Sequence, residues 1–127
     1  PLAERVIRDT HRARIRNSIN ILVGFPTETR SDFEDTLKFI EKNKENIDEI
    51  RLTFSGCRMY PDSYLRKNYK NFGITMLDID KWVSNDGENN YDERIKRAEE
   101  VCQLTLSSGI ELMFNSRPKR KSDLVKI

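Results

Sequence analysis

The sequence predicts an α/β fold in which parallel strands alternate with helices. An apolar run at residues 19–23 ends in Gly24, a helical pattern follows over 32–40, and a second apolar run covers 47–54. Because strand–helix–strand units close through a right-handed crossover, the two strands are expected to lie side by side and parallel. Parallel α/β folds bind ligands at the carboxyl ends of their strands, so the loops after these two runs are the expected site.

Residues 2–16 are predicted to form a basic helix on the outside of the domain. Five arginines lie along this segment, with Leu2, Val6 and Ile15 as its sparse apolar side. A solvated outer helix is one interpretation, and contact with an anionic partner is the other. No aromatic residue is interleaved with the arginines for base stacking, so nucleic acid is not the expected partner. The arginines are Arg5, Arg8, Arg12, Arg14 and Arg16.

The first strand is predicted to end in a tight loop. Gly24 has no Cβ, so it lets the chain turn sharply or lets a ligand approach the backbone. Pro26 lacks an N–H and fixes φ, which ends the strand. Ser31 and Glu34 fit a capping box, so the following helix is expected to begin near Asp32.

The second strand leads into residues 55–69, which share its end of the sheet. This segment is either an ordinary connection, with Gly56 and Pro61 as turn residues, or the lining of a ligand site. Arg58 is able to pair with a carboxylate or phosphate of a substrate. Cys57 is either a redox participant or a small buried thiol. The candidate lining residues are Phe54, Ser55, Cys57 and Arg58.

Residues 91–108 are predicted to form a long amphipathic helix, because their apolar residues recur at helical spacing. Asn90 is a good N-cap, and Gly109 supplies the stop. Glu93 and Arg97 are expected to form a favourable pair on the charged outer face of this helix.

Two further segments follow from the pattern near the carboxyl terminus. Residues 110–114 are predicted to form a short final strand. Residues 115–127 form a basic tail with RPKRK at 117–121, which is either a terminal extension or a contact for an anionic partner.

The polar loop 84–90 lacks the spacing of a calcium loop, so calcium is not expected there.

Composition limits the chain to one modest domain. Of 127 residues, 36% are hydrophobic and 35% are charged. A complete (β/α)8 barrel needs roughly 200 residues or more, so this chain is expected to supply only part of one and to turn some apolar strand surface toward the missing part. No apolar run is long enough to span a bilayer, and no signal-peptide pattern is present, so no membrane association is expected.

Cysteine usage excludes a metal site built from this chain alone. Cys57 and Cys102 are its two cysteines and His11 its only histidine, and neither cysteine has a neighbour at metal-ligand spacing. No metal ligand and no catalytic side chain is therefore assigned. Two unpaired cysteines fit a reducing compartment, and the predicted location is the cytoplasm.

Several motifs in order resemble the second half of a radical S-adenosylmethionine (radical SAM) enzyme barrel. They are NILVGFPTET, a D-F-E-x-T-L-x-F-I helix, an I-D-x-I strand and a loop that ends in Ser63-Tyr64-Leu65. Asp62 stands where the family usually has glycine. The resemblance covers roughly residues 13–110 and is closest to the subgroup that often carries a cobalamin-binding domain.

The resemblance implies a partial (β/α) barrel over residues 1–114, completed by an N-terminal half with a C-x3-C-x2-C loop for a [4Fe-4S] cluster. The expected parent enzyme cleaves S-adenosylmethionine to a 5′-deoxyadenosyl radical that acts on an unknown substrate, and the subgroup implies cobalamin on a separate domain. The fragment alone is expected to be inactive. By resemblance, the cofactor adenine would meet Leu22, Val23, Gly24, Phe25 and Pro26.

The alternative is a non-catalytic α/β module. In this interpretation residues 5–16 and 117–121 recognise an anionic or nucleic-acid partner. A cluster motif encoded upstream would separate the two hypotheses.

Overall fold

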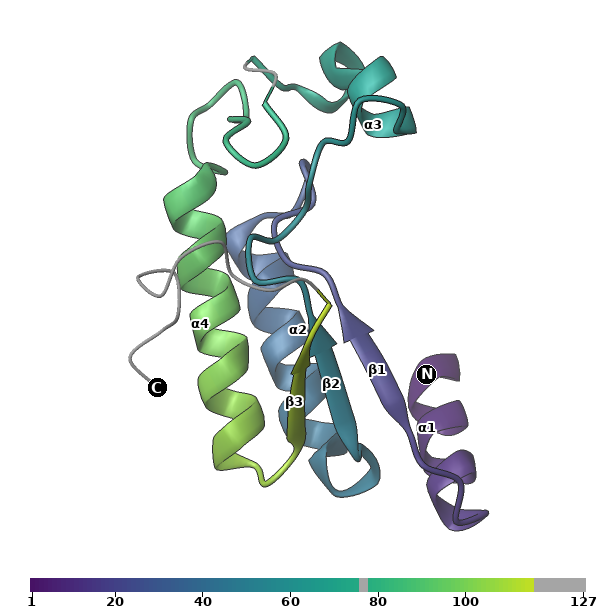
Figure 1. Ribbon diagram of the computed structural model, residues 1–127. Helices are drawn as coiled ribbons and strands as arrows, with labels where there is room; N and C mark the ends of the chain where they lie inside the picture. The colour runs from purple at the N-terminus through teal and green to yellow at the C-terminus, as the bar shows by residue number, and fades with distance from the viewer. Residues whose placement is uncertain (76–77, 116–127) are drawn as a thin grey trace.

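The computed structural model describes residues 1–75 and 78–115 and shows a mixed α/β arrangement (Figure 1). The three strands form one parallel sheet in the order β1-β2-β3. In chain order the elements are α1 (Leu2–Arg12), β1 (Ser18–Ile21), α2 (Arg30–Asn43), η1 (Lys44–Asn46), β2 (Glu49–Leu52), α3 (Tyr64–Lys67), η2 (Tyr69–Phe72), α4 (Tyr91–Ser107) and β3 (Glu111–Phe114).

The predicted neighbouring strands are confirmed. β1 and β2 pair in parallel, with Ile21 opposite Leu52 at their carboxyl ends. The loops that begin after these residues therefore leave the sheet at the same edge, as the strand–helix–strand order predicts. The predicted final strand is also present and pairs with β2.

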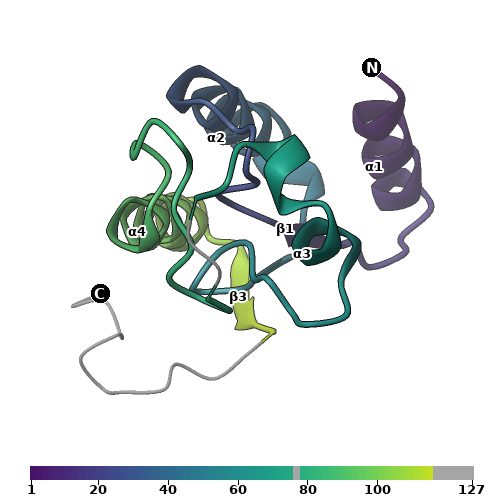
Figure 2. The same cartoon turned by 90° about the horizontal axis from the view of Figure 1, so that it is seen from above.

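Helices α2 and α4 pack side by side on one face of the sheet (Figure 2), and α1 lies next to α2. An ion pair of 3.0 Å between Lys42 Nζ and Glu4 Oε2 joins α2 to α1. Alternate strand residues point into this helical layer, as the two-residue period of a strand requires. The core is formed by Ile19, Ile21, Ile50, Leu52, Leu112 and Phe114 from the strands and by Phe33, Leu37, Ile40, Ala98 and Val101 from the helices.

Two predicted helix boundaries are wrong. The first helix ends at Arg12 rather than Arg16, because Arg14 adopts a left-handed φ of 59° and turns the chain toward the sheet. Helix α2 is capped by Thr29 instead of Ser31: the Thr29 hydroxyl accepts from the Asp32 N–H, and the Asp32 carboxylate accepts from the Thr29 N–H at 2.8 Å. Both Thr29-x-x-Asp32 and Ser31-x-x-Glu34 fit a capping box, and the folded chain uses the earlier one.

The sheet face away from the helices is mostly polar, so it offers little of the apolar strand surface that the sequence predicts toward a missing part. Side chains in register across this face are Ser18, Glu49 and Glu111 in one row and Asn20, Arg51 and Met113 in the next. Only Met113 among them is apolar, and it is 44% exposed. The apolar strand residues are already used against α2 and α4, so alternation leaves polar side chains on the other face.

Glu49 is the centre of this polar face. Its side chain is 7% exposed and accepts hydrogen bonds from the Ser18 hydroxyl at 2.6 Å and from Arg51 Nε at 2.6 Å. Arg16 Nη2 adds a third contact at 3.3 Å and also pairs with Glu111. These donors, the Ser18 hydroxyl first, lower the pKa of Glu49 to about 2.

We expect Glu49→Gln to remove part of the acid sensitivity of folding. A carboxyl with a folded pKa near 2 and an ordinary value of 4.5 stabilises the fold fully above pH 4.5 and loses that contribution as the pH falls toward 2. Urea unfolding between pH 2 and 6 should therefore show a shallower decline for Glu49→Gln than for the wild type. Glu88→Gln, an exposed loop change, serves as the control. Parallel curves for wild type and Glu49→Gln would show that the ionised carboxylate is not stabilising.

Candidate functional site

The loops that follow β1 and β2 lie against each other at the carboxyl edge of the sheet. The Cys57 N–H donates to the Val23 carbonyl at 2.9 Å, which joins the two loops directly. The structure thus brings together the two predicted segments, residues 22–26 and 54–58. This backbone hydrogen bond holds the two loops in a defined position relative to each other, at the edge where a ligand is expected.

A residue that sequence reasoning missed, Arg94 of α4, lies beneath both loops. Gly24 and Gly56 have φ values of +72° and +71°, and a Cβ at either would crowd the Arg94 side chain. At Gly24 it would lie closer than 3.0 Å to Cγ and Cδ of Arg94. The space that a Cβ would fill is therefore occupied by the Arg94 side chain. Packing against Arg94 explains the glycine, whereas the resemblance implied contact with adenine.

The Arg94 guanidinium is fully buried and lies 3.9 Å from the centre of the Trp82 ring. Its terminal nitrogens donate to the Asn89 side-chain oxygen at 3.1 Å and to the carbonyls of Asp80 and Trp82 at 2.6 and 3.1 Å. Nε has no hydrogen-bond partner among the described residues. Burial lowers the pKa of Arg94 to about 10, so the group stays charged at neutral pH.

A second arginine of the same helix holds the loop after β1. The Gly24 N–H donates to Glu28 Oε2 at 2.7 Å, and Arg97 Nη1 donates to Glu28 Oε1 at 3.2 Å. Burial raises the pKa of Glu28, against the opposing effect of its hydrogen bonds. Arg97 also pairs with Glu93 at 3.1 Å as predicted, but its side chain is only 4% exposed, so this pair is not on an outer face.

The sequence does contain a signal for the buried arginine. Arg94 lies on the helical stripe that continues through Ala98, Val101 and Thr105, all of them buried. A charged residue on an apolar stripe usually needs polar partners inside the fold. Its partners here are loop carbonyls that no helical pattern reveals.

The five residues proposed to contact the cofactor differ in how much of their side chain is exposed. Val23 is fully buried in the core, and Gly24 and Pro26 are buried as well. Leu22 is 53% exposed. Phe25 is half-buried and packs edge-on against Phe72 at 5.9 Å. Leu22 and Phe25 therefore keep side-chain surface for a ligand.

The four residues proposed to line the site also differ in burial and in the partners that they already have. Phe54 is part of the core, and Ser55 is half-buried. Burial raises the pKa of the Cys57 thiol to about 11, which keeps it protonated at neutral pH. Arg58 already donates from Nε to Asp80 at 2.7 Å and from Nη1 to the Tyr60 hydroxyl at 2.9 Å. An incoming carboxylate or phosphate would have to compete with Asp80.

A second, smaller hydrophobic core lies beyond the carboxyl ends of the strands, next to the two strand-end loops. It consists of Cys57, Met59, Ile74 and Trp82, and the Trp82 indole N–H donates to the Cys57 carbonyl at 2.9 Å. Asn89 extends the connection, because its side-chain amide donates to the Phe25 carbonyl at 3.0 Å. The segments on either side of residues 76–77 thus contact both strand-end loops.

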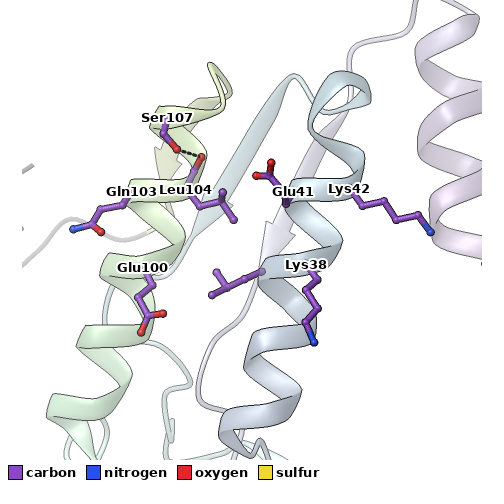
Figure 3. Close-up of a pocket in the computed structure, with 8 residues that line it drawn as sticks. Lys38, Glu41, Lys42, Glu100, Gln103, Leu104 and Ser107 are labelled. Carbon is purple, nitrogen blue, oxygen red and sulfur yellow. Dashed lines mark hydrogen bonds between the residues drawn. The ribbon is translucent and has the colours of Figure 1, made fainter.

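A groove of about 710 Å³ lies elsewhere, between α2 and α4 (Figure 3). Leu37 and Leu104 supply its apolar surface, with Lys38, Glu41 and Glu100 among its charged lining residues. It contains none of the predicted site residues, and Glu100 is paired with Arg30 at 2.7 Å. Its place on the helical layer separates it from the strand-end loops.

Among the described residues there is no group of three or more His, Cys, Asp or Glu side chains placed to hold a metal ion. Cys57 and Cys102 are both buried and free. None of the helices in the described part of the chain has the length and apolar character needed to cross a membrane. The basic segment 117–121 lies outside the described residues.

Comparison with protein-family models, with curated proteins and with solved structures gives no match for this chain.

Proposed function

We propose that this chain is the C-terminal part of a radical SAM-type barrel. One observation supports the proposal most: the GFP-containing loop and the loop after the next strand lie side by side at the carboxyl edge of a parallel sheet. The consecutive strand order with α2 and α4 in one layer is also the arrangement of (β/α) barrel units. The motifs from Asn20 to Leu65 supply the chemical identity, which the fold by itself does not.

In this proposal the chain binds and orients the cofactor without acting as acid or base. Leu22 and Phe25 would provide apolar contacts to the adenine, and Arg94 and Arg97 would hold the loop behind them. Bound S-adenosylmethionine with a [4Fe-4S] cluster supplies the radical chemistry, and the protein supplies position and exclusion of water. The cluster would be held by cysteines outside these 127 residues, and the subgroup that the motifs resemble often carries cobalamin on another domain. Free buried thiols suit a reducing, cytoplasmic setting.

In the alternative, an anionic partner binds residues 5–16, but several arginines of this segment already pair with carboxylates of the chain. Arg16 is directed to Glu49 and Glu111 on the sheet, and Arg5 and Arg8 share Asp9 at 3.7 and 3.8 Å. The arginines of the predicted helix therefore do not form a single free surface.

The coding sequence upstream of Pro1 should contain a C-x3-C-x2-C motif. The longer protein, reconstituted anaerobically with iron and sulfide, should then hold a [4Fe-4S] cluster and form 5′-deoxyadenosine under reducing conditions. The 127-residue chain treated in the same way should retain no stoichiometric iron, because it lacks three clustered thiolates. A start codon directly before Pro1, or a stable cluster on the short chain, would contradict the proposal.

A further inference from the structure

The segment that contains α3 and η2 presents exposed aromatic and basic side chains together. Tyr60 is 52% exposed and Tyr64 is 72% exposed. We define the α3–η2 surface as Tyr60, Tyr64, Lys67, Lys70 and Asn71, all of which are exposed. Figures 1 and 2 show that α3 stands off the sheet at the edge where the strands end.

The charge of this segment is predominantly positive. Residues 60–72 contain Arg66, Lys67 and Lys70 and one carboxylate, the exposed Asp62. None of these three cations forms an ion pair with a described carboxylate, whereas Lys38, Lys42 and Lys44 of the α2–η1 region are all paired. Unpaired cations keep their full attraction for an external anion.

The local structure gives the surface a defined shape. Ser63 caps α3, and Tyr64 and Lys67 lie three residues apart, on the same side of the helix. Arg66 turns inward and donates from Nη1 to the Met59 carbonyl at 3.3 Å. Lys70 Nζ lies 5.9 Å from the centre of the Tyr69 ring. The exposed lysines thus come from an anchored segment.

The aromatic side chains connect this surface to the strand-end site. The Tyr64 ring packs edge-on against Phe72 at 6.2 Å, and Phe72 packs edge-on against Phe25 at 5.9 Å. Edge-on support fixes a ring while leaving much of its face available. With 72% of Tyr64 exposed, its ring is able to receive another planar group.

We infer that the α3–η2 surface binds single-stranded nucleic acid. The lysines match the phosphate backbone, and the exposed tyrosines match unpaired bases, which stack on aromatic rings independently of sequence. The Asn71 side chain adds a hydrogen-bonding group that suits base edges. An acidic peptide would use the lysines but would leave the tyrosine rings without stacking partners. Residues 2–16 are basic without aromatic neighbours, whereas residues 60–72 interleave both kinds.

This inference stands apart from the proposed enzyme. It concerns a partner and needs neither a cluster nor a cofactor. If both proposals hold, the chain of rings Tyr64, Phe72 and Phe25 places a bound strand next to the proposed cofactor site.

Fluorescence anisotropy with the 127-residue chain tests the inference. The probes are a labelled oligothymidylate about 12 nucleotides long and an abasic strand of equal length, which has the same charge but no bases. Lys67→Ala with Lys70→Ala should weaken binding of the oligothymidylate about tenfold and reduce the slope of log affinity against log salt by about 0.7 for each phosphate contact removed. The matched control, Arg5→Ala with Arg8→Ala, removes two exposed cations from α1 and should change affinity less than about twofold.

Stacking is tested separately at Tyr64. Tyr64→Leu should weaken oligothymidylate binding about fivefold or more and leave binding of the abasic strand unchanged, whereas Tyr64→Phe should bind like the wild type. Circular dichroism should show that every variant is folded. The inference is overturned if the oligothymidylate does not bind, or if the α1 variant weakens binding as much as the lysine variant. It is also overturned if polyglutamate or the abasic strand binds as tightly as the oligothymidylate.

Discussion

Replacing Arg94 with methionine should lower the free energy of unfolding by about 3 kcal/mol. Methionine keeps much of the stem that packs against Gly24 and Gly56 but cannot donate hydrogen bonds. The Asn89 side-chain oxygen and the carbonyls of Asp80 and Trp82 would each lose their bond to the guanidinium. Removal of a buried charge offsets part of the loss, yet several buried acceptors without donors cost more.

Urea unfolding measures this change, and Lys96→Met on the exposed side of α4 is the matched control. Trp82 is the only tryptophan, and the Arg94 guanidinium lies 3.9 Å from its ring centre, so its fluorescence reports directly on the site. Arg94→Met should shift the emission to the red, and Arg94→Lys should be intermediate because an ammonium lacks the planar fork. Wild-type stability and unchanged emission in Arg94→Met would show that Arg94 does not hold the two loops and the Trp82 segment together.

Gly24→Ala should cost about 3 kcal/mol, far more than an alanine at another glycine with the same backbone conformation. The strain of a left-handed φ of +72° accounts for about 1 kcal/mol. The rest arises because the new Cβ would overlap Cγ and Cδ of Arg94, which sit in the middle of a side chain fixed at its far end. Gly87→Ala has a φ of +75° and no atom within 4 Å of the new Cβ, so it measures strain alone.

A double-mutant cycle identifies the source of the extra cost. In an Arg94→Ala background the overlap is gone, so Gly24→Ala should there cost about as much as Gly87→Ala. If Gly24→Ala and Gly87→Ala lower the free energy of unfolding equally in the wild-type background, the Arg94 side chain moves aside without loss of stability. In the proposed enzyme, a larger residue such as valine at Gly24 should also abolish turnover and leave the cluster intact, and displacement of Arg94 is the reason that the structure supplies.

The order of elements and the neighbouring strands could be predicted from the sequence because both depend on local patterns. Apolar runs locate β1 and β2, and helical spacing locates α4. Asn90 caps α4 as expected, and the crossover rule places the ends of β1 and β2 together. The start of α2 could not be chosen, since two overlapping capping boxes fit the same stretch. The early end of α1 depends on a left-handed residue, Arg14, that is not a glycine.

The sequence by itself determined that this chain is a parallel α/β unit with its candidate site at the ends of two adjacent strands. Only the tertiary structure decided what fills that site and which strand face stays polar. Arg94 is buried because two glycines and three loop acceptors, distant along the chain, converge on it. Glu49 is buried because Ser18 of the neighbouring strand and Arg16 reach it across the sheet, beside Arg51 of its own strand. Spacing along a helix or strand reports the direction of a side chain, whereas its partners depend on segments that only folding brings within reach.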